Sequence, residues 1–301
     1  MTATFGHSSI LLAFVIALAG SVIPILVPRG ANERYVTFAR WGILGQFILV
    51  FLAGSALVYG LVTTDFSIRY VVFNTTRATP IYYRITGLWG ALEGSLLLWE
   101  WILIIFSGIV AWVYRDRHRE MMPWVLMVFC IVSAFFLGVI AFVSNPFEII
   151  SPVPPDGRGL NPLLEDANMM SHPPLLYTGF VGLTVPYAFA MAALIVGKLD
   201  DAWIVTTRRW TIIAWFFLTM GNLVGAYWSY PSWQPPGTGL DYQAVTLPTG
   251  DSTLTLIRSF TMPPVSPIGP LYFYAAMFAP GTLSLETLAS NGDTCEFWLG
   301  E

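Results

Sequence analysis

The sequence predicts an all-α, polytopic membrane protein: a bundle of about six transmembrane helices followed by an irregular C-terminal tail. Hydrophobic residues make up 55% of the 301 residues and charged residues only 11%, whereas about 25% of a soluble domain is charged. Aromatic residues reach 15%, as in proteins with aromatic belts at the membrane interfaces. These figures exclude an ordinary soluble domain, and no run of basic residues indicates a nucleic-acid partner.

Six stretches are apolar enough to cross a bilayer, for which a helix needs about 20 residues. The first has no basic segment before it and is followed by further spans, so we expect a retained helix and not a cleaved signal peptide. The third, residues 85–113, carries Glu93 and Glu100. The other five are residues 8–27, 41–62, 123–143, 175–196 and 210–228.

The loops between these stretches differ in positive charge. Loops 28–40, 114–122 and 197–209 hold nine Lys and Arg residues together, and loops 63–84 and 144–174 hold four. Cytoplasmic loops carry the excess of Lys and Arg. The sequence therefore predicts that the N-terminus, the two less basic loops and the C-terminal tail lie outside the cytoplasm.

His172 is the most informative single residue, in a chain with three histidines. It lies in the run NMMSHPPLLY (168–177), at the predicted outer start of the fifth span, where two prolines suit the beginning of a helix. Three interpretations are open: an axial haem ligand, a zinc or copper ligand without a second His or Cys nearby, or an interfacial imidazole bonded to a loop carbonyl. The residue by itself favours the third interpretation.

Glu93 and Glu100 are two helical turns apart and share one face of the third stretch. Carboxylates inside a membrane usually face the protein interior or a wet cavity. They would form a polar path or a cofactor-facing surface. Alternatively, Glu93 lies near the outer interface and Glu100 makes one interhelical hydrogen bond. Trp89, just before them, is expected to be an interface anchor.

The remaining candidates carry weaker signals. His7 precedes the first span, and His118 lies among arginines in a loop that should be solvated. Cys130 falls inside an apolar stretch and is expected to be a packing residue, whereas Cys295 lies in the tail. With no Cys-x-x-Cys pair, the sequence predicts no thiol-redox centre of its own.

Three stretches of the sequence resemble one family. They are residues 87–99 (GLWGALEGSLLLW), residues 145–164 with the runs NPF and DGRGLNPLL, and residues 172–182 (HPPLLYTGFVG). These motifs resemble the N-terminal part of the CcmF family, which belongs to the cytochrome c assembly protein superfamily. The resemblance covers about residues 5–230. One departure is Leu92, where the family usually has a histidine.

The resemblance implies a component of cytochrome c maturation, a haem lyase (cytochrome c synthase) subunit. Such proteins attach haem to the Cys-x-x-Cys-His thiols of apocytochrome c on the outer side of the bacterial inner membrane. It implies haem b as the group handled, and apocytochrome c, a haem chaperone and other maturation subunits as partners in the bilayer. It makes His172 one of two outer axial ligands of the substrate haem iron; a catalytic residue is not assigned.

After Tyr230 the sequence departs from the family. The tryptophan-rich run expected there is absent, residues 231–241 read PSWQPPGTGLD, and no histidine follows. The apolar piece 268–280 is too short to span a membrane. We therefore expect a transmembrane part, residues 1–230, and a divergent tail, residues 231–301, that reflects a frameshift, a truncation or a split gene. The alternatives to a maturation component, itself expected to be incomplete alone, are a transporter or permease fragment and a non-functional remnant.

Overall fold

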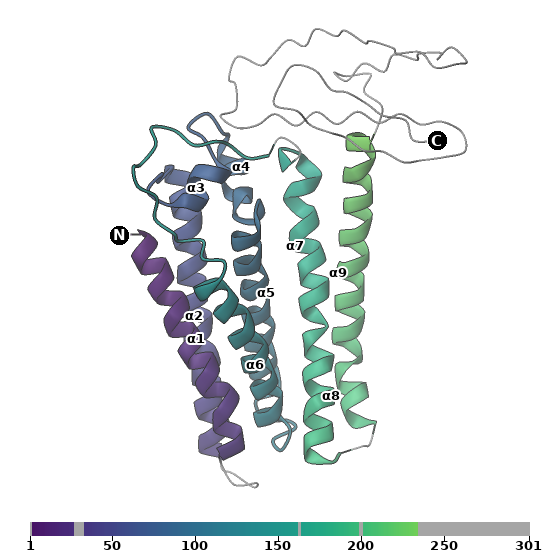
Figure 1. The fold of residues 1–301 in the computed structure, drawn as a ribbon. Coiled ribbons are helices and arrows are strands. Elements are labelled where there is room, and N and C mark those ends of the chain that lie inside the picture. Colours follow the sequence, from purple (N-terminus) through teal and green to yellow (C-terminus); the bar gives the residue numbers. More distant parts are fainter. Residues whose placement is uncertain (1, 27–32, 162–163, 199–200, 234–301) are drawn as a thin grey trace, which may run out of the picture. The chain divides into compact units, whose positions relative to one another are not determined.

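The fold is a bundle of long helices (Figure 1). The structure, a computed structural model, describes residues 2–26, 33–161, 164–198 and 201–233. Among these residues six helical segments are long and apolar enough to cross a membrane, so the predicted all-α, multi-pass architecture is confirmed. The long helices are α1 (Thr2–Leu26), α2 (Glu33–Thr63), α5 (Leu92–Val113), α6 (Met122–Phe142), α7 (Ala167–Gly182) with α8 (Thr184–Val196), and α9 (Ala202–Trp233).

The predicted span 85–113 and the loop before it were wrong in detail. Three short helices occupy this region: α3 (Arg69–Asn74), α4 (Ile81–Thr86) and the 3-10 turn η1 (Gly87–Trp89). Ala91 then has extended backbone, and α5 begins at Leu92. The membrane helix is shorter than its apolar sequence because the residues before Leu92 form a separate turn that is bonded to α3.

The start of the fifth span was also predicted wrongly. α7 begins at Ala167, eight residues before the predicted start, and Pro173 and Pro174 lie inside it. Asp166 is the N-cap, and its side chain accepts a hydrogen bond from the backbone N–H of Asn168 at 2.7 Å. An N-cap aspartate supplies an acceptor for the first turn of a helix, so the cap and not the proline pair sets where α7 begins.

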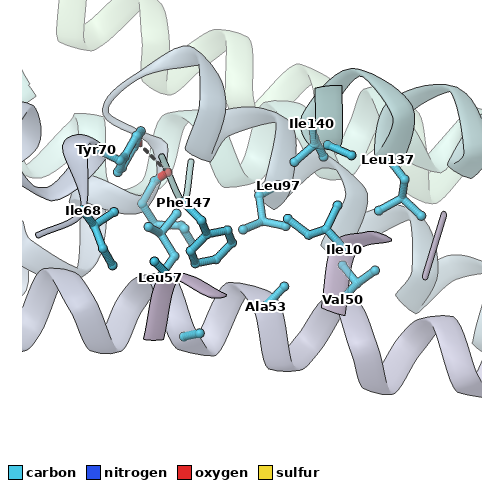
Figure 2. Packing of buried hydrophobic residues seen from close by; sticks show 14 of the residues in the cluster. Ile10, Val50, Ala53, Leu57, Ile68, Tyr70, Leu97, Leu137, Ile140 and Phe147 are labelled. Carbon is cyan, nitrogen blue, oxygen red and sulfur yellow. Dashed lines mark hydrogen bonds between the residues drawn. The ribbon is translucent and has the colours of Figure 1, made fainter. Parts of the chain in front are cut away.

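Helices α1, α2, α5 and α6 share one apolar core (Figure 2). Side chains with no exposed surface meet there from all four helices, so each helix buries one face against its neighbours. A second buried cluster joins α5 and α6 to α8 and contains Cys130, which confirms its packing role. The fully buried members of the first cluster include Ile10, Val50, Ala53, Leu57, Leu97, Leu137 and Ile140.

Helices α7 and α9 lie side by side along their length (Figure 1). A Cβ atom added to Gly179 would overlap the backbone of Leu218, and one added to Gly221 would lie 2.7 Å from the Cα of Leu176. Membrane helices approach closely where small residues face the partner helix. The two backbones are therefore close enough for polar groups on one helix to reach the other.

This contact predicts different outcomes for two glycine substitutions. Gly221→Ala inserts a methyl group into the α7–α9 contact, and overpacking of this kind costs about 1–3 kcal/mol of unfolding free energy. Gly108→Ala is the control, because a Cβ there meets nothing within 4 Å and alanine favours a helix over glycine. Thermal unfolding in detergent should show a lower midpoint for Gly221→Ala and an unchanged or higher one for Gly108→Ala. Equal midpoints would contradict the close contact.

Candidate functional site

His172 lies in the second turn of α7 and faces α9. Its Nδ1 atom is 2.8 Å from the carbonyl oxygen of Gly221, and its ring centroid is 6.0 Å from that of Trp228 at an interplanar angle of 30°. A Cβ atom on Gly225 would overlap the imidazole. Gly225 thus makes room for the ring, and Gly221 supplies its hydrogen-bond partner.

The contact with Gly221 fixes which ring nitrogen of His172 carries the hydrogen. A backbone carbonyl only accepts, so Nδ1 donates, and in the neutral imidazole Nε2 keeps a free lone pair. Metal-bound histidines usually donate their other N–H to a carbonyl or carboxylate in this way. The interfacial interpretation of His172 included a bond to a loop carbonyl. The structure contains a carbonyl partner, although helix α9 and not a loop provides it. This bond leaves Nε2 free as a ligand.

A multidentate metal site is not found in the described part of the chain. No group of three or more His, Cys, Asp and Glu side chains gathers there at metal-binding distance. A zinc or copper site usually needs three or four protein ligands. His172 thus has no support from the described residues as a zinc or copper ligand, whereas an axial haem ligand needs no such cluster.

Tyr70 of α3 holds the turn that precedes α5. Its hydroxyl oxygen lies 2.9 and 3.0 Å from the carbonyl oxygens of Gly87 and Leu88, and it accepts the backbone N–H of Ala91 at 3.2 Å. Burial raises the pKa of Tyr70 well above its ordinary value, so the hydroxyl stays protonated and able to donate. This bonding explains why α5 begins only at Leu92.

Trp89 connects this turn to α7. Its indole Nε1 donates to the carbonyl oxygen of Met169 at 3.2 Å, and the hydroxyl of Ser95 donates to the carbonyl of Trp89 at 3.1 Å. The side chain is half-buried at the edge of the first core cluster. Trp89 was predicted to be an interface anchor, and the structure adds a specific bond to the helix that carries His172.

The loop of residues 144–161 is bonded to α3. An isolated antiparallel bridge joins Ile68 to Ile149, and Arg158 donates its backbone N–H to the carbonyl of Val72 at 2.6 Å. Helix α3 thus contacts the loop and, through Tyr70, also bonds the turn before α5. The guanidinium of Arg69 also pairs with Glu148 at 2.6 Å, and this bond raises the pKa of Arg69.

Glu100 belongs to a different part of the bundle. It has no exposed surface and accepts a hydrogen bond from the hydroxyl of Ser133 on α6. The Ser133 hydroxyl also lies 3.0 Å from Oε1 of Gln46 on α2, whose Nε2 lies 3.7 Å from the sulfur of Cys130. These four residues form a polar cluster between three helices. The bond from Ser133 to Glu100 is an interhelical hydrogen bond, as in the alternative interpretation of Glu100.

Glu93 does not join this cluster. It lies in the first turn of α5, two turns from Glu100, and is partly exposed. An acidic residue in the first turn interacts favourably with the helix dipole. The two carboxylates therefore have separate surroundings.

The other two histidines lie away from α7. His7 is on α1, and its Nδ1 is buried without a hydrogen-bond partner. The loop of His118 is exposed, and His118 itself is partly exposed. Its ring packs against Tyr114 and Phe189, and its Nε2 lies 3.1 Å from the hydroxyl of Thr206. Aromatic packing therefore holds this loop residue against α8 and α9.

Comparison with known proteins places the chain in a family. A family model described as cytochrome C assembly protein matches residues 89–236. The chain is 40% identical over 231 residues to the cytochrome c-type biogenesis protein CcmF of Haemophilus influenzae, covering 76% of this chain and 36% of the relative. A solved structure, the cytochrome c heme lyase CcmF, aligns with a TM-score of 0.66 at 32% identity, over 76% of this chain and 36% of that one.

The chain belongs to the CcmF family and matches its N-terminal part. CycK of Rhizobium meliloti is also 40% identical, over 76% of this chain and 34% of its own length. The probable biogenesis protein NrfE of Escherichia coli is 38% identical over 69% of this chain and 38% of its own. The chain thus spans about a third of the length of these relatives.

Of the three stretches that resemble the CcmF family, the first contacts the second and the helical turn just before the third. A Cβ on Gly90, in the first stretch, would lie 2.6 Å from the side chain of Leu160 in the second. Trp89 of the first stretch bonds Met169, three residues before His172 in the third. The motifs are therefore parts of one assembly around the start of α7, and not three independent sites.

Two residues beside His172 were missed by sequence reasoning. Gly225 and Trp228 contact its ring from α9, and neither was predicted as part of a site. Gly221 and Gly225 are separated by three residues, the spacing of a close helix–helix contact in membranes. That spacing is visible in the sequence and was the available signal.

The cluster around Glu100 predicts an effect on stability. Ser133→Ala removes the group that bonds both Glu100 and Gln46, and an orphaned buried polar group costs about 1–3 kcal/mol. Ser107→Ala is the matched control, because that buried hydroxyl bonds only the carbonyl of Ile104 in its own helix. Thermal unfolding in detergent should separate the two variants. A Ser133→Ala midpoint equal to that of Ser107→Ala would refute a three-helix role for the cluster.

Proposed function

We propose that the chain is a haem-handling component of cytochrome c maturation and that His172 is an axial ligand of the substrate haem iron. The observation that carries the proposal is the hydrogen bond from His172 Nδ1 to the carbonyl of Gly221. This bond leaves the lone pair of Nε2 available to iron. The family supports the same function, since the solved relative is named a cytochrome c heme lyase.

The residues beside His172 fit a haem. An imidazole with its second nitrogen bonded to a backbone carbonyl has the usual arrangement of a metal-bound histidine. Trp228 packs beside the imidazole and adds an apolar aromatic surface to the site. These residues bind and orient the substrate, and Gly225 leaves the space that the ring needs.

Haem itself supplies the reactive groups of the proposed reaction. Each of two cysteine thiols of apocytochrome c adds its S–H across one haem vinyl group, so a thioether forms and no other product leaves. His172 holds the iron and thereby fixes where the vinyl groups lie. A second axial ligand, the haem chaperone and the other maturation subunits lie outside residues 2–233 in this proposal.

The proposed location is the bacterial inner membrane with the N-terminus on the outer side. The support is the charge of the loops, because three alternate loops hold nine Lys and Arg residues and the other two hold four. Helices α3 and α4 and the first turns of α7 share one end of the bundle (Figure 1). In this orientation His172 lies at the outer end, where apocytochrome c is matured.

The transporter alternative loses its main support. It depended on Glu93 and Glu100 as parts of a polar path. Glu100 is bonded to Ser133 of α6, which also contacts Gln46 of α2, and Glu93 lies at the end of its helix. Neither arrangement favours transport over a structural role, so haem handling remains the function that the geometry supports best.

The three histidines allow a complete test of haem binding. The purified chain is titrated with haem in detergent under reducing conditions, and binding is followed by the Soret band. His172→Ala should weaken haem binding at least tenfold, because one iron–imidazole bond is lost. His7→Ala and His118→Ala should bind like the wild type. Haem binding that does not change in a folded His172→Ala variant would overturn the proposal, as would no binding by the folded wild type.

A further inference from the structure

Pro173 leaves a backbone carbonyl in α7 without its usual partner. In an α-helix the N–H of each residue donates to the carbonyl four residues earlier. Pro173 has no N–H, and its ring crowds that carbonyl, which belongs to Met169. The proline lies inside α7 and not at its start, so the missing bond falls within the helix and one residue from His172.

Trp89 donates to this same carbonyl. Its indole Nε1 lies 3.2 Å from the oxygen of Met169, the acceptor that an N–H on residue 173 would use. Trp89 comes from η1, a different element, whose position is set by Tyr70 and by the Ser95 hydroxyl. The side chain therefore replaces a bond of α7 with a bond to the neighbouring turn.

We propose that Trp89 is a positioning residue for His172. Its indole N–H substitutes for the donor that Pro173 lacks and holds the first turns of α7 against η1. Met169 is less than one helical turn from His172, so fixing its carbonyl fixes the register in which His172 Nδ1 reaches the carbonyl of Gly221. Trp89 acts through the backbone carbonyl of Met169.

The positioning role adds to the proposed haem site. It rests on the proposed function only where haem binding is what is measured. Two features position the His172 ring: the Gly221 carbonyl on α9, to which Nδ1 is bonded, and the backbone of α7, which carries the residue. Trp89 controls the second. The positioning role therefore has a structural readout that exists without haem.

The test uses Trp89→Phe, which removes the N–H and keeps an aromatic ring. Trp101→Phe is the matched control, since the indole of Trp101 is also half-buried and donates to a backbone carbonyl, that of Val50, at 2.8 Å. Hydrogen–deuterium exchange of the peptide containing residues 167–176 is measured on the full chain. Loss of one hydrogen bond should make this segment exchange about three- to tenfold faster in Trp89→Phe, with no change in Trp101→Phe.

Pro173→Ala provides the rescue. The alanine restores a backbone N–H that can donate to Met169, so Trp89→Phe with Pro173→Ala should return exchange of the segment to that of Pro173→Ala alone. If Trp89→Phe does not fold, the double variant carries the test, because its restored helix bond should recover folding. Exchange in Trp89→Phe equal to Trp101→Phe, or no rescue by Pro173→Ala, would overturn the positioning role.

Haem titration separates this inference from the proposed function. Under both proposals, Trp89→Phe weakens haem binding about three- to tenfold and Pro173→Ala restores it. Faster exchange and rescue in a chain that binds no haem would support the positioning role and reject the proposed function. Weaker haem binding without any change in exchange would reject the positioning role and leave the proposed function standing.

Discussion

The close approach of α7 and α9 determines the position of His172. In lipid no hydrophobic force drives two helices together, so packing of small residues and interhelical hydrogen bonds must hold them. Gly221 has no Cβ to clash with Leu176, and its carbonyl can therefore reach the imidazole of His172. Because a carbonyl accepts and never donates, one backbone contact decides which ring nitrogen is available to a ligand.

A second set of contacts holds the beginning of the same helix. The loop of residues 144–161 is fastened to α3, Tyr70 of α3 binds the turn before α5, and Trp89 of that turn bonds the backbone of α7. The stretches that resemble the CcmF family are the main parts of this chain of contacts. These stretches therefore act mainly through packing and hydrogen bonds, and the helix that these contacts hold carries His172.

The sequence predicted the six spans because each is a long apolar run, and hydropathy depends on composition alone. It did not predict where α5 begins, since that depends on Tyr70, about twenty residues earlier in the chain. The sequence contains a local signal for the start of α7, Asp166 before Ala167, but the prediction was based on the proline pair instead. The partner of His172 is 49 residues away, and only the tertiary structure identifies it. The boundary at residues 230 and 231 and the nature of the tail remain predictions, because the residues after 233 lie outside the described part.

The tautomer of His172 tests the central claim most directly. Nitrogen-15 NMR of the haem-free chain in detergent distinguishes the two ring nitrogens, and comparison with His172→Ala identifies the resonances. The structure predicts that Nδ1 carries a hydrogen, since the Gly221 carbonyl is the acceptor. A hydrogen found on Nε2 instead would mean that the α9 carbonyl does not orient the ring, and the account of the site would fail.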